Sequence, residues 1–124
     1  MKIGLDYHGV VDTNVRFFKT FARLLINDGN EVHLITGTSR KDYDSFDFEK
    51  KVSFTHFYSI TDSLINLKVD YTIDKHGRPI FSNALWYNSK AHYCKDNKID
   101  IMIDDTEMYS KFFTTPFVLW KRNK

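Results

Sequence analysis

The chain lacks the features that mark secreted, membrane-spanning and repetitive proteins. Its single cysteine, Cys94, cannot form an internal disulfide, and no basic stretch followed by an apolar one resembles a secretion signal. No apolar run approaches the roughly 20 residues that a helix needs to cross a bilayer. There is also no internal repeat and no linker. We therefore expect a protein of the reducing cytoplasm, with no membrane partner.

An excess of one charge is also lacking. The 18 basic and 16 acidic residues give a formal net charge of +2, which supplies no strong attraction to nucleic acid or membrane. We interpret a local basic patch at 121–124 as a solvated end. Hydrophobic residues make up 42% and charged residues 27% of the sequence, which is typical of globular proteins. The 124 residues suffice for one domain with a core, so we expect a single domain over 1–124.

Strand and helix patterns alternate from the start of the chain. Residues 2–7 predict a buried strand that leads into a glycine turn. Apolar residues then recur at three- and four-residue spacing over 13–28, which predicts an amphipathic helix with Asp12 or Thr13 as its N-cap. The β-rich run at 31–36 predicts a second strand. The chain therefore opens with a strand-helix-strand unit.

The same alternation continues along the rest of the chain. We expect further strands at 56–60, 99–103 and 117–120, and further helices at 40–51, 61–67, 89–97 and 107–112. Two β-prone arms around a glycine turn predict a small hairpin within 71–81. Five strands that alternate with helices predict an α/β fold. We expect one Rossmann-like domain of three layers, with a mainly parallel five-stranded sheet and the hairpin as an insertion.

Polar residues follow the predicted strands at their carboxyl ends, where ligands bind in sheets of this kind. They are Asp6 and His8 after the first strand, Thr36 and Gly37 at the second, and Asp104 and Asp105 after the strand at 99–103. Converging carboxylates suit Mg²⁺, which takes oxygen ligands and keeps positions for water and a substrate phosphate. Thr36 and the Gly37 amide offer donors to phosphate oxygens. Lys90, at the start of the predicted helix 89–97, would neutralise the remaining charge.

The order of these residues resembles the haloacid dehalogenase (HAD) superfamily of phosphohydrolases. The stretch IGLDYHGVV at 3–11 matches its first motif, an apolar strand followed by Asp-x-Asp-Gly-hydrophobic, except that His8 replaces the second Asp. VHLITG at 32–37 matches the second motif, Lys90 is taken as the third, and IMIDD at 101–105 matches the fourth. The motifs span nearly the whole chain. The first and fourth together are the specific part, because Thr-Gly and a lone lysine are common.

The resemblance implies a nucleophile and a metal site. Asp6 would attack a phosphoryl group to give an aspartyl-phosphate, which water then cleaves. Mg²⁺ would be held by Asp6, by the backbone carbonyl of His8 and by Asp104, with Asp105 binding it directly or through water. Taken alone, Asp6 also fits a turn or helix-capping residue, and the acidic pair at another strand end favours the functional interpretation.

The resemblance also implies which residues hold the transferring phosphoryl group. Thr36, the Gly37 amide and Lys90 would bind it, so catalysis would come chiefly from positioning and charge stabilisation. Arg40 lies close behind Thr36 and is a candidate for substrate binding, although a surface role suits it better. Thr36 also fits a helix-start cap. Two other lysines compete with Lys90 for the third motif: Lys75 and Lys95.

His8 is the departure from the family pattern. Phosphatases of the family have at this position an Asp that protonates the leaving oxygen and later activates water. Because the metal takes this residue's carbonyl, the replacement leaves the metal site intact. A histidine, with a reference pKa of about 6.5, is a competent acid and base near neutrality. Two interpretations stay open: an active phosphatase that uses His8, or a catalytically impaired protein that binds phosphate or a partner.

The sequence leaves no room for a cap domain, so we expect a relatively open site. An open site suits a large substrate such as a nucleic-acid end or a phosphoprotein, or one that a second subunit of a homo-oligomer closes. We favour a small phosphomonoester, such as a nucleotide, whose base would stack on an aromatic and basic rim. The rim candidates are Tyr71, His76, Arg78, Trp86 and Tyr87, of which the last two equally fit a role in packing the hairpin.

The remaining histidines give no prediction of a transition-metal site. His92 and Cys94 are two residues apart on a predicted helix, which places them on different faces and argues against zinc. His33 and His56 lie within predicted strands. We interpret both as hydrogen-bonded or edge-exposed residues rather than as ligands.

Overall fold

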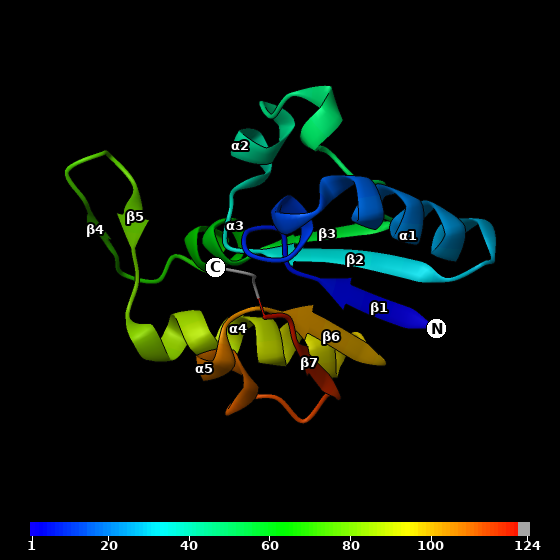
Figure 1. Ribbon diagram of the computed structural model, residues 1–124. Helices are drawn as coiled ribbons and strands as arrows, with labels where there is room; N and C mark the ends of the chain where they lie inside the picture. Colours follow the sequence, from blue (N-terminus) through cyan, green and yellow to red (C-terminus); the bar gives the residue numbers. More distant parts are fainter. Residues whose placement is uncertain (122–124) are drawn as a thin grey trace.

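The computed structural model of the protein describes residues 1–121, in which a five-stranded parallel sheet lies between two layers of helices (Figure 1). The strands lie in the order β3-β2-β1-β6-β7. Their bounds are Lys2–Leu5 (β1), Glu31–Thr36 (β2), His56–Ser59 (β3), Ile101–Asp104 (β6) and Phe117–Leu119 (β7). The predicted Rossmann-like α/β fold is confirmed. Apart from its first residue, the basic patch at 121–124 lies outside the described residues.

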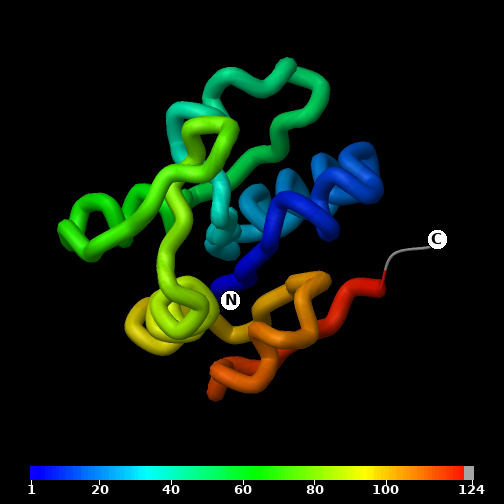
Figure 2. The backbone as a smooth tube through the Cα atoms, turned by 90° about the vertical axis from the view of Figure 1, so that its left-hand side faces the viewer, coloured from blue at the N-terminus to red at the C-terminus, as the bar shows by residue number. Residues whose placement is uncertain are grey.

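The helices connect these strands, and a separate hairpin projects beyond the sheet (Figures 1 and 2). The helices are Val15–Asn27 (α1), Arg40–Asp44 (α2), Ile60–Asn66 (α3), Asn83–Asp96 (α4) and Glu107–Ser110 (α5). The hairpin pairs Thr72–Ile73 (β4) with Pro79–Ile80 (β5) in antiparallel fashion, as the sequence predicts. Among the described residues, no helix combines the length and the apolar character that a membrane crossing would require.

Successive side chains along a strand point to opposite faces of the sheet, and each face carries its own apolar cluster. Leu34 of β2 packs in one cluster with Phe18 of α1, whereas the next residue, Ile35, packs in another with Met102 of β6 and Cys94 of α4. All five are fully or almost fully buried. Because burying a large aliphatic side chain contributes about 1.5–3 kcal/mol, the two clusters hold the sheet and both helical layers together. The rigid sheet then fixes the positions of the residues at its carboxyl edge.

Helix α1 begins later than predicted and has a different N-cap. Asn14 caps it, since its side chain accepts a hydrogen bond from the Phe17 amide at 3.1 Å. The predicted caps are used elsewhere: the Asp12 carboxylate accepts from the Gly9 amide at 2.7 Å, and the Thr13 hydroxyl donates to the Val10 carbonyl. Asp12 is therefore part of the loop that follows β1.

The helix predicted over 40–51 is wrong in its length. Helix α2 ends at Asp44, and a short 3-10 turn at Phe48–Lys50 follows. The Ser45 hydroxyl donates to the Asp42 carbonyl at 2.6 Å, and the Lys51 ammonium donates to the Asp44 carbonyl at 2.8 Å. These side chains satisfy carbonyl groups that a longer helix would have bonded through its own backbone, so the helix ends there.

Helix α4 is longer than the predicted helix 89–97. Its N-cap is Ser82, whose hydroxyl accepts from the Leu85 amide, and the helix therefore begins six residues before the predicted start. As a result, Lys90 lies in the middle of α4 and not at its start. Cys94 of α4 packs against the sheet, and Lys90, one helical turn earlier, is buried on the same side of the helix.

Candidate functional site

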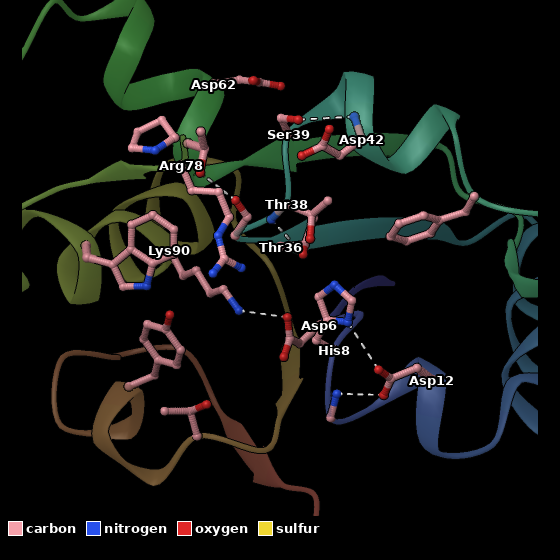
Figure 3. A pocket seen from close by; sticks show the side chains of 18 of the residues that line it. Asp6, His8, Asp12, Thr36, Thr38, Ser39, Asp42, Asp62, Arg78 and Lys90 are labelled. Carbon is pink, nitrogen blue, oxygen red and sulfur yellow. Dashed lines mark hydrogen bonds and ion pairs between the residues drawn. The ribbon is translucent and has the colours of Figure 1, made fainter. Parts of the chain in front are cut away.

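A cleft of about 1230 Å³ opens at the carboxyl ends of the central strands. Its lining side chains come from the loops that follow β1, β2 and β6, from helices α2, α3, α4 and α5, and from the β4–β5 hairpin (Figure 3). Most of the residues that the sequence identified as candidates line it: Asp6, His8, Thr36, Gly37, Lys90 and Asp105. Asp104 is fully buried and lies next to this lining through its bond to Lys90. The candidates from four distant segments therefore meet at one place.

A buried ammonium group joins the first and fourth motifs. The Nζ atom of Lys90 lies 3.0 Å from Oδ1 of Asp6 and 2.8 Å from Oδ2 of Asp104. Only 2% of the Lys90 side chain is exposed, and the Asp104 side chain is fully enclosed. The Tyr109 ring lies 4.6 Å from the same Nζ atom, close enough for a cation–π contact. The two rival lysines, Lys75 and Lys95, are exposed, and neither of them lines the cleft.

The Lys90 ammonium group contacts two carboxylates, so it offsets the negative charge of Asp6 only in part. Burial raises the pKa of Asp6 from its ordinary value of 3.8 to about 7; Lys90 opposes this rise, and the Asp104 carboxylate adds to it. Burial alone would lower the pKa of Lys90, but Asp6 and Asp104 raise it above its ordinary value. The ammonium group therefore stays charged, and Asp6 is the member of the group that gains or loses a proton near neutral pH.

This pKa makes the stability of the metal-free protein depend on pH. Because the pKa of folded Asp6 lies above its unfolded value, the folded chain binds an extra proton between about pH 4 and pH 7, and the free energy of unfolding falls as the pH rises through this window. Asp6→Asn removes this contribution. We expect chemical denaturation in EDTA to show a smaller fall for the variant than for the wild type.

The wild type and the variant are compared because other groups also change their pKa on folding. Burial lowers the pKa of His33 below its ordinary value of 6.5, which makes stability rise with pH in part of the same window. The pKa of Glu31 is lowered by its hydrogen bond with His33, and the pKa of Asp74 is lowered by the Arg78 backbone amide. Both act in the opposite direction to Asp6. Equal slopes in the wild type and in Asp6→Asn would contradict the raised pKa of Asp6.

Three carboxylates form a group that fits a divalent cation. Asp6, Asp104 and Asp105 each offer one oxygen, and these oxygens all lie within 4.8 Å of one another. Gly9 makes room for the third: a Cβ atom at this position would lie 2.0 Å from Oδ2 of Asp105, and its φ of +89° is one that glycine adopts readily. The glycine of the first motif therefore brings the loop after β1 against the acidic pair after β6.

His8 lies at the cleft and contacts Asp12, a residue that the sequence suggested only as a helix cap. Its Nδ1 atom lies 3.1 Å from Oδ2 of Asp12, and 61% of the His8 side chain is exposed (Figure 3). A carboxylate at this position accepts the Nδ1 proton and leaves Nε2 for other partners. The four-residue spacing from His8 to Asp12 is the signal that would have identified Asp12.

Thr36 and Gly37 line the cleft, and Gly37 lies against the indole ring of Trp86. Thr36 is 1% exposed, and its hydroxyl accepts a hydrogen bond from the Thr38 amide at 3.2 Å, which leaves the hydroxyl proton for another acceptor. A Cβ atom on Gly37 would lie 2.7 Å from Cζ2 of Trp86. Trp86 also stacks on Phe81, with ring centroids 6.1 Å apart. The Trp86 ring therefore both packs the hairpin region and lines the cleft.

The hairpin supplies one wall of the cleft through Asp74, Arg78 and Pro79. The Arg78 Nε atom lies 3.2 Å from Oδ2 of Asp74, and Figure 3 shows the Arg78 side chain pointing into the cleft. Sequence analysis named Arg78 as a rim candidate but missed Asp74, whose carboxylate also accepts from the His76 and Arg78 amides.

Other sequence candidates lie outside the lining. Arg40 pairs with Asp44 at 3.0 Å, and its guanidinium lies over the Phe54 and Phe57 rings. Three of the proposed rim residues, Tyr71, His76 and Tyr87, do not line the cleft. Tyr87 instead packs edge to face on Tyr109, with ring centroids 5.5 Å apart. The structure therefore places Arg78, and not Arg40, beside the candidate phosphate-binding residues.

No family model, no curated protein and no solved structure matches the chain. The residues in the cleft are therefore the basis for inferring a function.

Proposed function

We propose that the protein is a Mg²⁺-dependent phosphohydrolase of the HAD type, which cleaves a phosphomonoester through an aspartyl-phosphate on Asp6. One observation carries the proposal. A buried lysine contacts two aspartates at the ends of the adjacent strands β1 and β6, beside a third carboxylate. Burying so much charge costs several kcal/mol per ion, so such a group suits a functional site better than a stabilising one.

The three carboxylates fit a hard divalent cation by their chemistry and their spacing. Asp6, Asp104 and Asp105 offer oxygen atoms only, which Mg²⁺ prefers, and the backbone carbonyl of His8 is the fourth ligand that the motif suggests. When bound, the cation would offset the charge of the carboxylates and of the transferring phosphoryl group. It would also favour the ionised form of Asp6, which is the form that acts as a nucleophile.

The resemblance to the HAD superfamily implies two chemical steps. In the first, an oxygen of Asp6 attacks phosphorus, the bond from phosphorus to the substrate oxygen breaks, and that oxygen takes a proton from an acid. In the second, water attacks the phosphorus of the aspartyl-phosphate, its proton passes to a base, and the bond from phosphorus to Asp6 breaks. Lys90 and the Thr36 hydroxyl would stabilise the phosphoryl charge in both steps.

His8 is the group we assign to the proton transfers. Asp12 accepts the Nδ1 proton, so Nε2 is free to give a proton to the leaving oxygen and later to take one from water. The other ring nitrogen faces the cleft in Figure 3. The same Asp12 carboxylate binds the Gly9 amide at 2.7 Å, and it therefore fixes both the histidine and the turn on which the histidine is carried.

Substitution of His8 separates the active from the impaired interpretation. We expect His8→Ala to lower kcat by about 10²- to 10⁴-fold, the usual contribution of a general acid–base, and His8→Asp to keep or raise it. The measurement is the steady-state rate over about pH 5–8. Equal rates for the wild type and His8→Ala would remove His8 from the mechanism.

The size and lining of the cleft favour a substrate larger than a simple phosphate ester. At about 1230 Å³ the cleft exceeds the usual range of small-molecule pockets, about 300–1000 Å³. Trp86 offers a ring face on which a base can stack, and Arg78 offers a cation near the phosphate. A nucleotide is therefore our preferred substrate. A nucleic-acid end, or closure of the cleft by a second copy of the chain, would use the same walls.

The decisive experiment is a screen of phosphomonoesters with the wild-type protein in Mg²⁺, with EDTA as control. The panel includes an aryl phosphate, nucleoside monophosphates, sugar phosphates and a 5′-phosphorylated oligonucleotide. We expect Mg²⁺-dependent release of inorganic phosphate, fastest from a nucleotide. Binding of Mg²⁺ and phosphate without turnover at any pH would favour the catalytically impaired alternative. Absence of both would overturn the proposal.

Gly9→Ala tests the contact between the first motif and Asp105. The new methyl group would collide with the Asp105 carboxylate, so we expect a weaker Mg²⁺ affinity by at least about 10-fold and a lower melting temperature. Gly77→Ala is the matched control: its φ is +77°, but a Cβ atom there meets nothing within 4 Å. The control should show the backbone cost of about 1–2 kcal/mol and an unchanged Mg²⁺ affinity. Equal Mg²⁺ affinities of the two variants would contradict the contact.

A further inference from the structure

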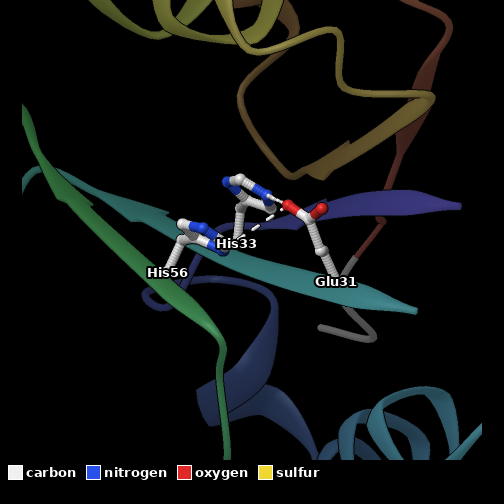
Figure 4. Close-up of side chains that lie close together, drawn as sticks. All are labelled: Glu31, His33 and His56. Atoms are coloured by element: carbon white, nitrogen blue, oxygen red, sulfur yellow. Dashed lines mark hydrogen bonds and ion pairs between the residues drawn. The ribbon is translucent and has the colours of Figure 1, made fainter. Parts of the chain in front are cut away.

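We infer that the protein has a second metal site, for Zn²⁺, formed by Glu31, His33 and His56 (Figure 4). Each side chain offers one ligand atom, and these atoms all lie within 4.8 Å of one another. None of the three residues lines the cleft. The site is therefore separate from the acidic group around Asp6, and it does not depend on the proposed phosphohydrolase activity.

The strand register brings the three side chains together. Glu31 and His33 are two residues apart in β2, so both project from the same face of the sheet. His56 of β3 is the direct register partner of His33. The two imidazole rings stack, with centroids 4.2 Å apart and planes within 5°. The ligands are thus carried by paired strands, which hold them more firmly than a loop would.

The distances suit one tetrahedral ion. Glu31 Oε1 lies 2.8 Å from His33 Nε2 and 3.6 Å from His56 Nδ1, as the converging dashed lines of Figure 4 show. Two ligands on a tetrahedral Zn²⁺, each about 2.0–2.1 Å from the metal, lie about 3.3 Å apart. The observed distances fall on either side of this value. A small movement of the Glu31 side chain, which is 38% exposed, brings the set to the required spacing.

A tyrosine on α4 orients the buried ligand. The Tyr93 hydroxyl lies 2.6 Å from Nδ1 of His33, so it can accept the Nδ1 proton and leave Nε2 for the metal. Burial raises the pKa of Tyr93 to about 12, which keeps the phenol neutral. The His33 side chain is 2% exposed and the His56 side chain 50%. The site is therefore fixed on one side and open on the other, where water can complete the coordination.

The donor atoms identify the class of metal. Two imidazole nitrogens and one carboxylate oxygen suit Zn²⁺ and similar late first-row cations, whereas Mg²⁺ and Ca²⁺ require oxygen ligands. Because β3 is an edge strand of the sheet, a bound ion would join this edge to β2. We therefore assign the site a structural role, in which Zn²⁺ stabilises the pairing of β2 with β3.

The test is calorimetric titration of the protein with Zn²⁺ in excess Mg²⁺, combined with the visible absorption spectrum of the Co²⁺-loaded protein. We expect one bound Zn²⁺, the intense spectrum of four-coordinate Co²⁺ and a rise in melting temperature on adding Zn²⁺. His56→Ala should weaken Zn²⁺ binding by at least about 10-fold and remove the rise in melting temperature. His92→Ala, which removes an exposed histidine of α4, is the matched control and should bind Zn²⁺ like the wild type.

Two further variants make the result unambiguous. Glu31→Gln should weaken Zn²⁺ binding as His56→Ala does, because both remove a ligand from the exposed side of the site. Asp6→Asn should bind Zn²⁺ with unchanged affinity, since it alters only the acidic group. The inference is wrong if the wild type binds no Zn²⁺, if His56→Ala binds it as tightly as the wild type, or if Asp6→Asn abolishes binding.

Discussion

Asp6→Asn is expected to lower Mg²⁺-dependent phosphate release by at least about a thousand-fold, the scale of effect seen when a nucleophile is removed. An amide has nearly the same shape as the carboxylate but cannot form the aspartyl-phosphate. The substitution also removes one of the two charges that Lys90 contacts, and Asp104 remains as its partner at 2.8 Å. The variant should therefore stay folded, which a melting curve checks.

The matched control for this loss is Asp42→Asn. Asp42 also lines the cleft, but it is exposed and lies outside the group of carboxylates that surrounds Lys90. We expect it to keep most of the wild-type rate. In the wild type, rapid acid quenching during turnover should also trap phosphate on the protein, and this signal should vanish in Asp6→Asn. Turnover by Asp6→Asn at a rate near that of the wild type would rule out nucleophilic catalysis by this residue.

Lys90→Met is expected to lower both stability and activity, and to have the largest effect on stability of these variants. Removing the ammonium leaves the Asp6 and Asp104 carboxylates buried and facing each other, a situation that costs about 3–5 kcal/mol of folding free energy. The phosphoryl group would also lose a cation, which lowers kcat by about 10²- to 10³-fold. Chemical denaturation in EDTA and steady-state kinetics in Mg²⁺ measure the two effects separately.

Mg²⁺ provides an internal check on the Lys90 result. A bound cation would replace part of the missing positive charge, so Mg²⁺ should raise the melting temperature of Lys90→Met more than that of the wild type. Lys95→Met, an exposed lysine on the same helix, is the control and should differ little from the wild type in either measurement. If Lys90→Met were as stable as Lys95→Met in EDTA, the buried ion group would not have the energetic role described above.

Hydrophobic periodicity was sufficient to predict the sheet and the edge at which the candidate residues meet. Strand β2 runs over Glu31–Thr36, as predicted, and the turn after β1 places Asp6 at the same edge. This succeeds because parallel strands all end on one side of a sheet, so a polar residue at a strand end has a defined place before any side-chain detail is known. The meeting of Asp6 with Asp104 followed from that rule alone.

Features that depend on side-chain contacts were not predicted. The cap of α1 and the start of α4 were misplaced because several Ser, Asp and Asn residues compete for each helix end, and tertiary contacts decide among them. Pairing of His8 with Asp12 depends on the shape of one loop, and the hairpin wall depends on how Phe81, just after β5, packs on Trp86. His33 and His56 were interpreted separately, because only the register of β2 with β3 makes them neighbours.

The contact between Lys90 and Asp6 joins residues that are 84 positions apart in the chain. Closing so long a loop is slow in folding, and the charged groups gain nothing until both β1 and β6 have taken their places. Partly folded forms would therefore hold these ions in water, apart from one another and unable to act on a phosphate ester. Recovery of activity during refolding should thus lag behind the recovery of helix content. The length of the lag would measure how long β1 and β6 take to pair.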